Sequence, residues 1–142
     1  MAAVKDAKVV WKEELAFEGI GGSGLKVSLD TVAEEGGGSG FSPMELVLVS
    51  LAGCTAMDVI SILKKKRQDV MSFEVRAHGL RADDHPKIYT DITLEYIVRG
   101  RDVDSNAVER AIELSETKYC SVNGMLSQVA QVTTAYRIEE AE

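Results

Sequence analysis

Two cysteines are the residues of this sequence whose type is best suited to chemistry. Cys54 lies among small residues in the middle of a long uncharged stretch, and Cys120 follows Tyr119 directly before Ser121. A thiolate can attack a peroxide oxygen, and a second thiol can then close a disulfide with the oxidised sulfur. By residue type alone, a cysteine is more often a small core residue than a reactive one. The sequence therefore favours redox chemistry only if the fold brings Cys54 and Cys120 together.

Two further side chains could act beside the cysteines. Asp58 comes one helical turn after Cys54, so the two would share a face of a helix. His85 lies in an Asp-Asp-His-Pro segment, whose composition is typical of a turn, and a turn residue is the simpler interpretation. A zinc site would need a third and a fourth ligand, which the spacing does not supply. We therefore expect no metal and no cofactor.

The composition of the 142-residue chain predicts one domain over residues 1–142. Hydrophobic residues make up 45% and charged residues 27%, which suffices for a core without a disulfide or a structural metal. The net charge of −7 argues against nucleic acid or an anionic membrane as a partner. We expect no signal peptide, and the uncharged run over residues 46–57 is too short to span a membrane. A cytoplasmic protein is the expectation.

The elements that must position the cysteines alternate between strands and helices. Ser42 and Pro43 begin a long helix over residues 42–67, and Glu45 completes a capping box. Period-two patterns predict strands on both sides of this helix, and helical spacing predicts two shorter helices before the last strand. The expected strands cover residues 9–17, 25–32, 73–77, 88–98 and 132–138, and the shorter helices begin near residues 104 and 119. This order predicts an α+β fold.

Both cysteine segments resemble the OsmC/Ohr family. SPMEL (residues 42–46) followed by AGCTAMDV (residues 52–59) is similar to the central helix of these proteins, and KYCSV (residues 118–122) is similar to their second-cysteine segment. The His85-Pro86 loop and residues 115–120 resemble the YhfA-like branch. The resemblance covers about residues 15–138. It implies an intertwined homodimer in which long central helices are flanked by antiparallel sheets.

The resemblance also implies an activity. In the peroxidase members, the first cysteine reduces an organic hydroperoxide and becomes sulfenic acid, the second condenses with it to a disulfide, and an external dithiol restores both thiols. Carried onto this sequence, Cys54 would attack and Cys120 would resolve. The physiological role would be defence against oxidative stress.

Two positions depart from the peroxidase pattern. The peroxidases place a glutamate directly after the proline that opens the helix, where this sequence has Met44, and Glu45 lies about half a turn out of phase with Cys54. They also use an arginine from the N-terminal hairpin, whereas here no arginine precedes Arg67 and Lys26 is the basic residue in the matching region. Lysine lacks the bidentate fork of arginine. Glu45 and Lys26, like Asp58 and His85, are therefore candidate supporting residues.

Three functions stay open at this point. The first is a dithiol-dependent hydroperoxide reductase, which the retained pair of cysteines favours. The second is a non-peroxidase protein that binds a small apolar or electrophilic molecule in the dimer cleft, which the missing arginine and glutamate favour. The third is a structural dimer with inert thiols.

Overall fold

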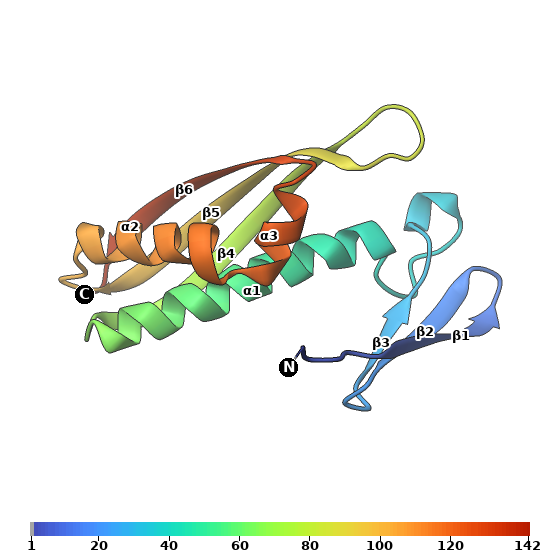
Figure 1. Cartoon of the computed structure of the whole chain (residues 1–142), viewed down its shortest axis with the longest axis horizontal. Coiled ribbons are helices and arrows are strands. Elements are labelled where there is room, and N and C mark those ends of the chain that lie inside the picture. Colours follow the sequence, from blue (N-terminus) through green and yellow to red (C-terminus); the bar gives the residue numbers. More distant parts are fainter. Residues whose placement is uncertain (1) are drawn as a thin grey trace. The chain divides into compact units, whose positions relative to one another are not determined.

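A computed structural model describes residues 2–142, and the chain divides into two compact units, one ending at Val47 and one comprising Leu48–Glu142. The first unit contains β1 (Ala7–Glu13), β2 (Ala16–Gly21), β3 (Lys26–Leu29) and the 3-10 helix η1 (Ala33–Glu35). The second contains β4 (Asp69–Arg81), β5 (Tyr89–Arg101), α2 (Ser105–Leu114), the π-helical turn η2 (Ser115–Tyr119), α3 (Ser121–Leu126) and β6 (Gln131–Glu140) (Figure 1). Helix α1 (Pro43–Lys65) begins in the first unit and continues into the second. The expected α+β class is confirmed.

The first unit is a three-stranded antiparallel sheet in the order β1-β2-β3. The expected single strand over residues 9–17 is wrong, because the chain reverses between β1 and β2. Glu14 adopts the left-handed conformation with φ of 48°, and the indole N–H of Trp11 donates a hydrogen bond of 2.9 Å to its carbonyl oxygen. A non-glycine residue in this conformation is uncommon and is hard to anticipate from sequence. Two short strands therefore replace the long one.

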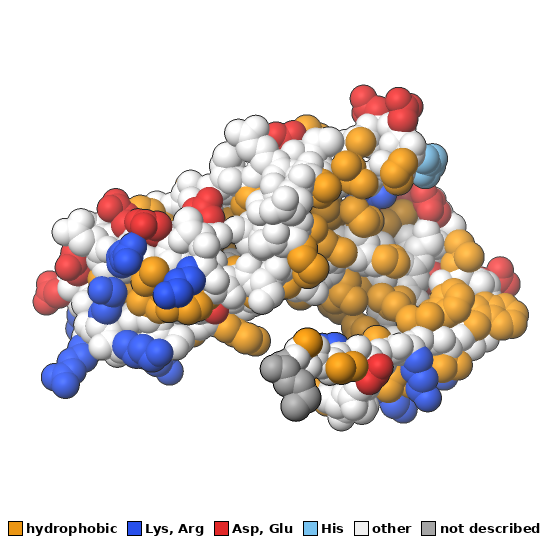
Figure 2. Space-filling view, viewed as in Figure 1, with side chains coloured by type: hydrophobic (Ala, Val, Ile, Leu, Met, Phe, Trp, Pro, Cys, Tyr) orange, Lys and Arg blue, Asp and Glu red, His pale blue; other side chains and the backbone are white. Residues whose placement is uncertain are grey.

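The boundaries of α1 follow the capping signals in the sequence. The backbone N–H of Glu45 donates to Ser42 Oγ at 3.3 Å, which confirms Ser42 as the helix cap. At the other end, Arg67 takes a left-handed conformation with φ of 56°, and the chain leaves the helix. Lysine and arginine side chains gather at this end (Figure 2), where their charge opposes the negative end of the helix dipole. The basic cluster is thus explained without a nucleic-acid partner.

The sheet of the second unit has the order β4-β5-β6 and is mixed. Strands β4 and β5 are antiparallel, whereas β5 and β6 are parallel, so the expectation of purely antiparallel sheets is wrong. Parallel neighbours need a long crossover, and here α2, η2 and α3 supply it between β5 and β6. In this unit, the helices lie on one face of the sheet (Figure 1).

The core of the second unit forms where three stripes of side chains meet. The alternation expected on β5 is confirmed, since every second residue along the strand points to the same face and is buried there: Ile92, Leu94, Tyr96 and Val98. Helix α1 contributes a buried stripe at intervals of four residues: Leu51, Thr55, Val59 and Leu63. Helix α2 and the start of η2 contribute a third: Val108, Ala111, Ile112 and Ser115. Each of the three stripes carries one hydroxyl among its apolar side chains.

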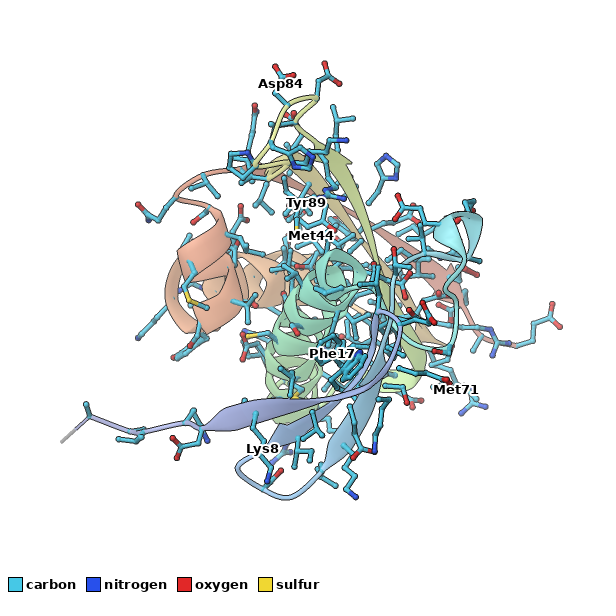
Figure 3. All side chains as sticks on the ribbon, turned by 90° about the vertical axis from the view of Figure 1, so that its right-hand side faces the viewer. Lys8, Phe17, Met44, Met71, Asp84 and Tyr89 are labelled. Atoms are coloured by element: carbon cyan, nitrogen blue, oxygen red, sulfur yellow. The ribbon has the colours of Figure 1, made fainter. Side chains whose placement is uncertain are left out.

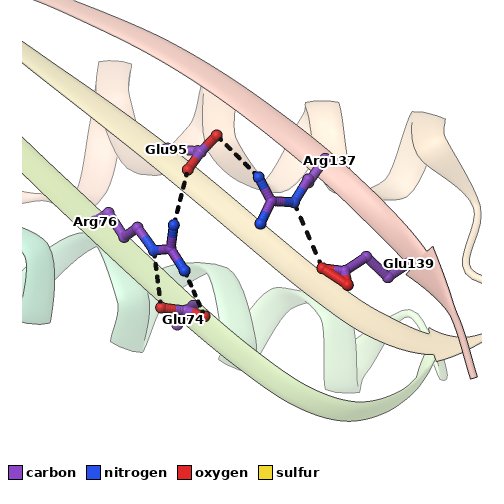
Figure 4. A network of polar contacts seen from close by, with 5 residues as sticks. All are labelled: Glu74, Arg76, Glu95, Arg137 and Glu139. Carbon is purple, nitrogen blue, oxygen red and sulfur yellow. Dashed lines mark hydrogen bonds and ion pairs between the residues drawn. The ribbon is translucent and has the colours of Figure 1, made fainter.

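The other face of this sheet carries a row of ion pairs (Figure 4). Arg76 contacts Glu74 at 3.1 Å and Glu95 at 3.9 Å, and Arg137 contacts Glu95 at 3.4 Å and Glu139 at 3.5 Å. These side chains are about half exposed, so water screens the pairs and they add little stability. They identify this face as the solvated one, which leaves the opposite face for the helices.

Helix α1 is far less covered than its composition requires. Its most apolar 18-residue window has a mean hydropathy of 2.1, and 22% of that window is buried within the chain. By length and composition alone α1 could cross a membrane, a test that the core helix of a soluble protein also passes. Val49 and Met57 are 49% and 73% exposed. An apolar surface of this kind is typical of an interface between subunits, as the expected homodimer requires.

Replacing Met57 with glutamate is expected to turn a dimer into monomers, because a carboxylate would be buried without a partner at the interface. Light scattering should give about twice 15.4 kDa for the wild-type chain and about 15.4 kDa for Met57→Glu. Met125→Glu adds the same charge at an exposed methionine of α3 and should leave the mass unchanged. A wild-type chain that stays monomeric at micromolar concentration would contradict the expected dimer.

Candidate active site

The structure brings both cysteines together with Asp58. The two Sγ atoms and a carboxylate oxygen of Asp58 all lie within 4.8 Å of one another. Cys54 is partly exposed, Cys120 is 5% exposed, and both thiols are free. Cys54 and Asp58 share a face of α1, as their spacing predicts. The condition for redox chemistry that the sequence left open, two cysteines within reach of each other, is thereby met.

Cys120 is held by the π-helical turn that precedes it. The backbone N–H of Cys120 donates to the carbonyl oxygen of Ser115 at 2.8 Å, five residues earlier. Cys120 then caps α3, because the backbone N–H of Asn123 donates to its sulfur at 3.4 Å. The cap of α3 is therefore the cysteine itself. Such π-helical turns are rare and frequently lie at functional sites.

A chain of buried hydroxyl groups runs from the core to Asp58. Ser115 Oγ donates to Asp58 Oδ2 at 2.9 Å. A hydroxyl has one proton, so Ser115 must accept from Thr55 Oγ1, which is 2.8 Å away. By the same reasoning Thr55 accepts from Tyr96 Oη at 2.8 Å. This row of hydroxyl groups fixes the Asp58 carboxylate and connects it to β5 through Ser115 of η2 and Thr55 of α1.

The three residues whose hydroxyl groups form this row are not among the site residues that the sequence predicts. A signal was nevertheless present, because Thr55, Tyr96 and Ser115 each interrupt an apolar stripe with a hydroxyl group. A buried polar atom needs a hydrogen-bond partner, so three such interruptions predict a shared network. Which hydroxyls meet depends on how the stripes pack, and periodicity does not contain that information.

The two thiols differ in how deeply they are buried, and Cys120 is the more deeply buried of the two. Burial raises the pKa of the Cys120 thiol to about 12, and its hydrogen bond with Cys54 acts in the same direction, against the N–H of Asn123. Burial likewise raises the pKa of Tyr96 to about 12. Cys120 thus stays protonated at neutral pH, which suits a thiol that reacts second.

Lys26 and Glu45 lie in the first unit and line one hollow there, together with Val27, Ser28 and Phe41 among others. Lys26 Nζ is 3.9 Å from a carboxylate oxygen of Glu18. The structure therefore gathers the two candidate supporting residues of the N-terminal region around a common space. Their action on Cys54 stays a prediction.

His85 lies elsewhere in the second unit. It is exposed in the loop between β4 and β5, at residues 82–88, and is not part of the group formed by Cys54, Asp58 and Cys120. Asp84, its neighbour, lies at the outer tip of this loop (Figure 3). The position agrees with the interpretation of His85 as a turn residue.

Residues 36–135 match the family described as OsmC-like protein. The chain belongs to this family. Protein YhfA of Escherichia coli (strain K12) is 43% identical over 135 residues, which cover 95% of this chain and 98% of YhfA. These findings confirm the resemblance to the OsmC/Ohr family and to its YhfA-like branch.

Solved structures show the same fold. A hypothetical protein from Aquifex aeolicus VF5 is 33% identical with a TM-score of 0.88, covering 99% of this chain and all of that one (100%). An organic hydroperoxide resistance protein OsmC from Legionella pneumophila is 14% identical with a TM-score of 0.70, covering 96% and 98% of the two chains. The organic hydroperoxide resistance protein OhrB of Bacillus subtilis is 13% identical with a TM-score of 0.64, covering 95% and 98%. At these low identities the last two likenesses concern the fold alone.

Raising the pH from about 9 to about 12 is expected to lower the free energy of unfolding. The unfolded Cys120 thiol ionises near its ordinary pKa of 9.0, whereas the folded thiol keeps its proton up to a pKa of about 12. In this window the unfolded chain binds fewer protons, so stability falls as pH rises, and Tyr96 adds to the fall above its ordinary pKa of 10.0. Urea unfolding at a series of pH values measures the slope.

Cys120→Ser and Tyr96→Phe should each flatten this slope, because each removes one titrating group. Ser121→Ala changes a neighbouring side chain that does not titrate and should leave the slope as in the wild type. Wild-type stability that stays constant or rises over this pH window would contradict the burial of both groups.

Proposed function

We propose that the protein is a thiol-dependent reductase of organic hydroperoxides that acts in defence against oxidative stress. Cys54 is the attacking thiol and Cys120 the resolving thiol. The observation that carries the proposal is the approach of both sulfur atoms to within 4.8 Å. The names of the Legionella and Bacillus proteins point to the same class of substrate.

The environments of the two thiols support this order of reaction. Cys54 is partly exposed and can meet a hydroperoxide, whereas Cys120 is buried behind η2. A pKa of about 12 keeps Cys120 as a thiol until Cys54 has been oxidised. A protonated thiol is a poor nucleophile towards peroxide, so the two sulfurs do not compete for the substrate.

The chemistry consists of two balanced steps and a reset. The Cys54 thiolate attacks the outer peroxide oxygen, the O–O bond breaks, and the alkoxide leaves as an alcohol after it takes up a proton. The sulfur of Cys120 then attacks the Cys54 sulfenic acid, which forms the disulfide and releases water. An external dithiol reduces the disulfide and becomes a disulfide itself.

Asp58 is placed to assist the second step. Its carboxylate lies within 4.8 Å of Cys120 and accepts a hydrogen bond from Ser115. As Cys120 attacks, its proton must move to a base, and the Asp58 carboxylate is the base available in the cluster. Asp58 therefore acts as the proton acceptor when the disulfide forms. The proposed reductase is a cytoplasmic homodimer.

The binding function remains the second candidate, and one observation favours it. A hollow of about 370 Å³ is lined by three largely apolar side chains, two lysines, one serine and one aspartate: Ile62, Leu114, Tyr119, Lys65, Lys66, Ser61 and Asp58. The chain also lacks an arginine before Arg67. Such a protein would hold a small apolar or electrophilic molecule without turning over hydroperoxide.

Stoichiometric organic hydroperoxide is expected to produce an intramolecular disulfide between Cys54 and Cys120, because the sulfurs are already near each other. Peptide mass spectrometry after digestion without reductant identifies the bond. In Cys120→Ser the first step proceeds and the second cannot, so Cys54 should accumulate as sulfenic acid that a dione probe labels.

Asp58→Asn separates the two steps further, since it should slow the second step and let sulfenic acid accumulate transiently. Asp84→Asn makes the same change on the exposed β4–β5 loop and should behave as the wild type. Both thiols intact after prolonged exposure of the wild-type chain would rule out the reductase and leave the binding function.

The missing arginine and glutamate should limit the rate of turnover. Attack on a peroxide requires the thiolate, so turnover should be weak at neutral pH without the arginine that favours this form. Lys26→Arg combined with Met44→Glu restores the two family residues and should raise turnover at neutral pH by more than the two single changes combined. The reason is that arginine needs a carboxylate to hold its fork in place.

The measurement is hydroperoxide consumption at neutral pH for the wild type, both single variants and the double variant. Lys8→Arg combined with Met44→Glu is the matched control, since Lys8 lies on β1 (Figure 3) and outside the hollow that Lys26 lines. Fast turnover of the wild type at neutral pH would show that another cation replaces the arginine.

A further inference from the structure

We propose that reduced Cys54, Cys120 and Asp58 form a binding site for a thiophilic divalent metal ion of the Zn²⁺ and Cd²⁺ class. The inference goes beyond peroxide chemistry and does not depend on it, because it requires only two reduced thiols and a carboxylate. It reverses the expectation of no metal, which was based on the lack of a third and a fourth ligand in the sequence. The fold supplies the third ligand.

The three donor atoms already have nearly the spacing that a metal requires. All of them lie within 4.8 Å of one another. With Zn–S bonds of about 2.3 Å and Zn–O bonds of about 2.0–2.2 Å, ligands around a tetrahedral ion lie roughly 3.5–3.8 Å apart. Closing the cluster onto an ion thus needs movements of about 1 Å, which side-chain rotation provides.

The type of ligand selects the class of ion. Two thiolates and one carboxylate carry three negative charges, which match a divalent cation and exclude an anion. Sulfur ligands favour zinc and its heavier relatives over magnesium and calcium, which prefer sites made of oxygen. Three protein ligands leave a fourth position open, as in zinc sites that also bind water or a substrate.

The groups around the cluster are arranged as the outer shell of a metal site requires. Ser115 Oγ donates to Asp58 Oδ2 at 2.9 Å, and Ser115 is itself held by Thr55. The backbone N–H of Asn123 donates to Cys120 Sγ at 3.4 Å. Hydrogen bonds of this kind orient metal ligands and stabilise the charge on a metal-bound sulfur. Each buried ligand therefore already has a partner that holds it in place.

A second, independent observation at the cluster is an unpartnered oxygen atom. Asn123 is 4% exposed, and its Oδ1 is the buried side-chain atom without a hydrogen-bond partner among residues 2–142. Asn123 borders a narrow void together with Thr55, Tyr96, Glu116 and Cys120. Buried acceptors are nearly always satisfied, so an orphaned one next to Cys120 marks an unusual polar environment around this ligand.

Metal binding and disulfide formation exclude each other at this site. Oxidation to the disulfide joins the two sulfurs and removes the negative charge of both thiolates, and a neutral disulfide is a poor ligand, so two-electron oxidation of the thiols must release the ion. Conversely, an ion on both sulfurs blocks the attack of Cys54 on a peroxide. The cluster therefore exists either as a metal dithiolate or as a disulfide.

Cd²⁺ titration of the fully reduced chain tests the site directly, with sulfur-to-metal charge-transfer absorption as the readout. We expect one ion per chain. Cys54→Ser and Cys120→Ser should each weaken binding more than Ser115→Ala, for which the loss is roughly 10- to 100-fold, as for other outer-shell partners. Asp58→Asn should weaken binding but keep the sulfur absorption, and Asp84→Asn should match the wild type. Circular dichroism of each metal-free variant checks its fold.

A readout on the unaltered chain makes the test independent of variants. Zn²⁺ should protect the partly exposed Cys54 from alkylation, as counted by mass spectrometry, and a chelator should abolish the protection. Equal alkylation with and without Zn²⁺, or Cd²⁺ absorption that survives in the Cys54→Ser, Cys120→Ser double variant, would overturn the inference. Disulfide formation by hydroperoxide is scored separately, so failure of the metal site and failure of the reductase are distinguishable.

Discussion

Thr55 Oγ1 lies between two other hydroxyl groups, Tyr96 Oη and Ser115 Oγ, each at 2.8 Å, inside an otherwise apolar core. Through these contacts α1, β5 and the start of η2 meet at one point. A buried polar group that loses its partner costs about 1–3 kcal/mol, so any slippage between these elements would be penalised at several atoms together. The arrangement of the site depends on this junction, because it sets where η2 leaves α2 and therefore where Cys120 faces Cys54.

The junction also explains how one small cluster can contain two thiols of different character. Cys54 projects from the middle of α1 and remains partly exposed, whereas Cys120 caps α3 behind the π-helical turn. Ser115 holds both Cys120 and Asp58 in place, since its carbonyl oxygen accepts a hydrogen bond from Cys120 N–H and its hydroxyl donates one to Asp58. Electrons, protons and a metal ion would thus all act on the same few atoms. Which of them acts is decided by the oxidation state of the sulfurs.

Helix α1 is apolar both where it packs within the chain and where it is exposed. Its stripe from Leu51 to Leu63 packs against the sheet and α2, and its remaining surface is apolar as well. A chain of this size cannot cover such a helix on every side, and the expected homodimer would cover the remaining surface. The exposed Met57 lies on α1 directly before Asp58, so the expected interface and the cluster are adjacent along the helix.

The sequence by itself determined the class of fold, the cap at Ser42, the buried face of β5, and the two cysteines with Asp58 as the residues of interest. These features follow from local rules: caps, periodicity and the spacing of four residues that places Asp58 beside Cys54. It did not reveal the reversal at Glu14, the parallel pairing of β5 with β6, or the π-helical turn. Each of these is decided by packing that sequence periodicity does not describe.

The tertiary structure alone decided that Cys120, 66 positions after Cys54 in the chain, reaches the same face of α1. It also decided that three scattered hydroxyl groups join into one chain that ends at Asp58. The physical reason is that residues far apart in sequence meet only when whole apolar stripes pack against one another. The stripes could be recognised from their spacing, but the partners of the few polar atoms within them exist only once the stripes are in contact.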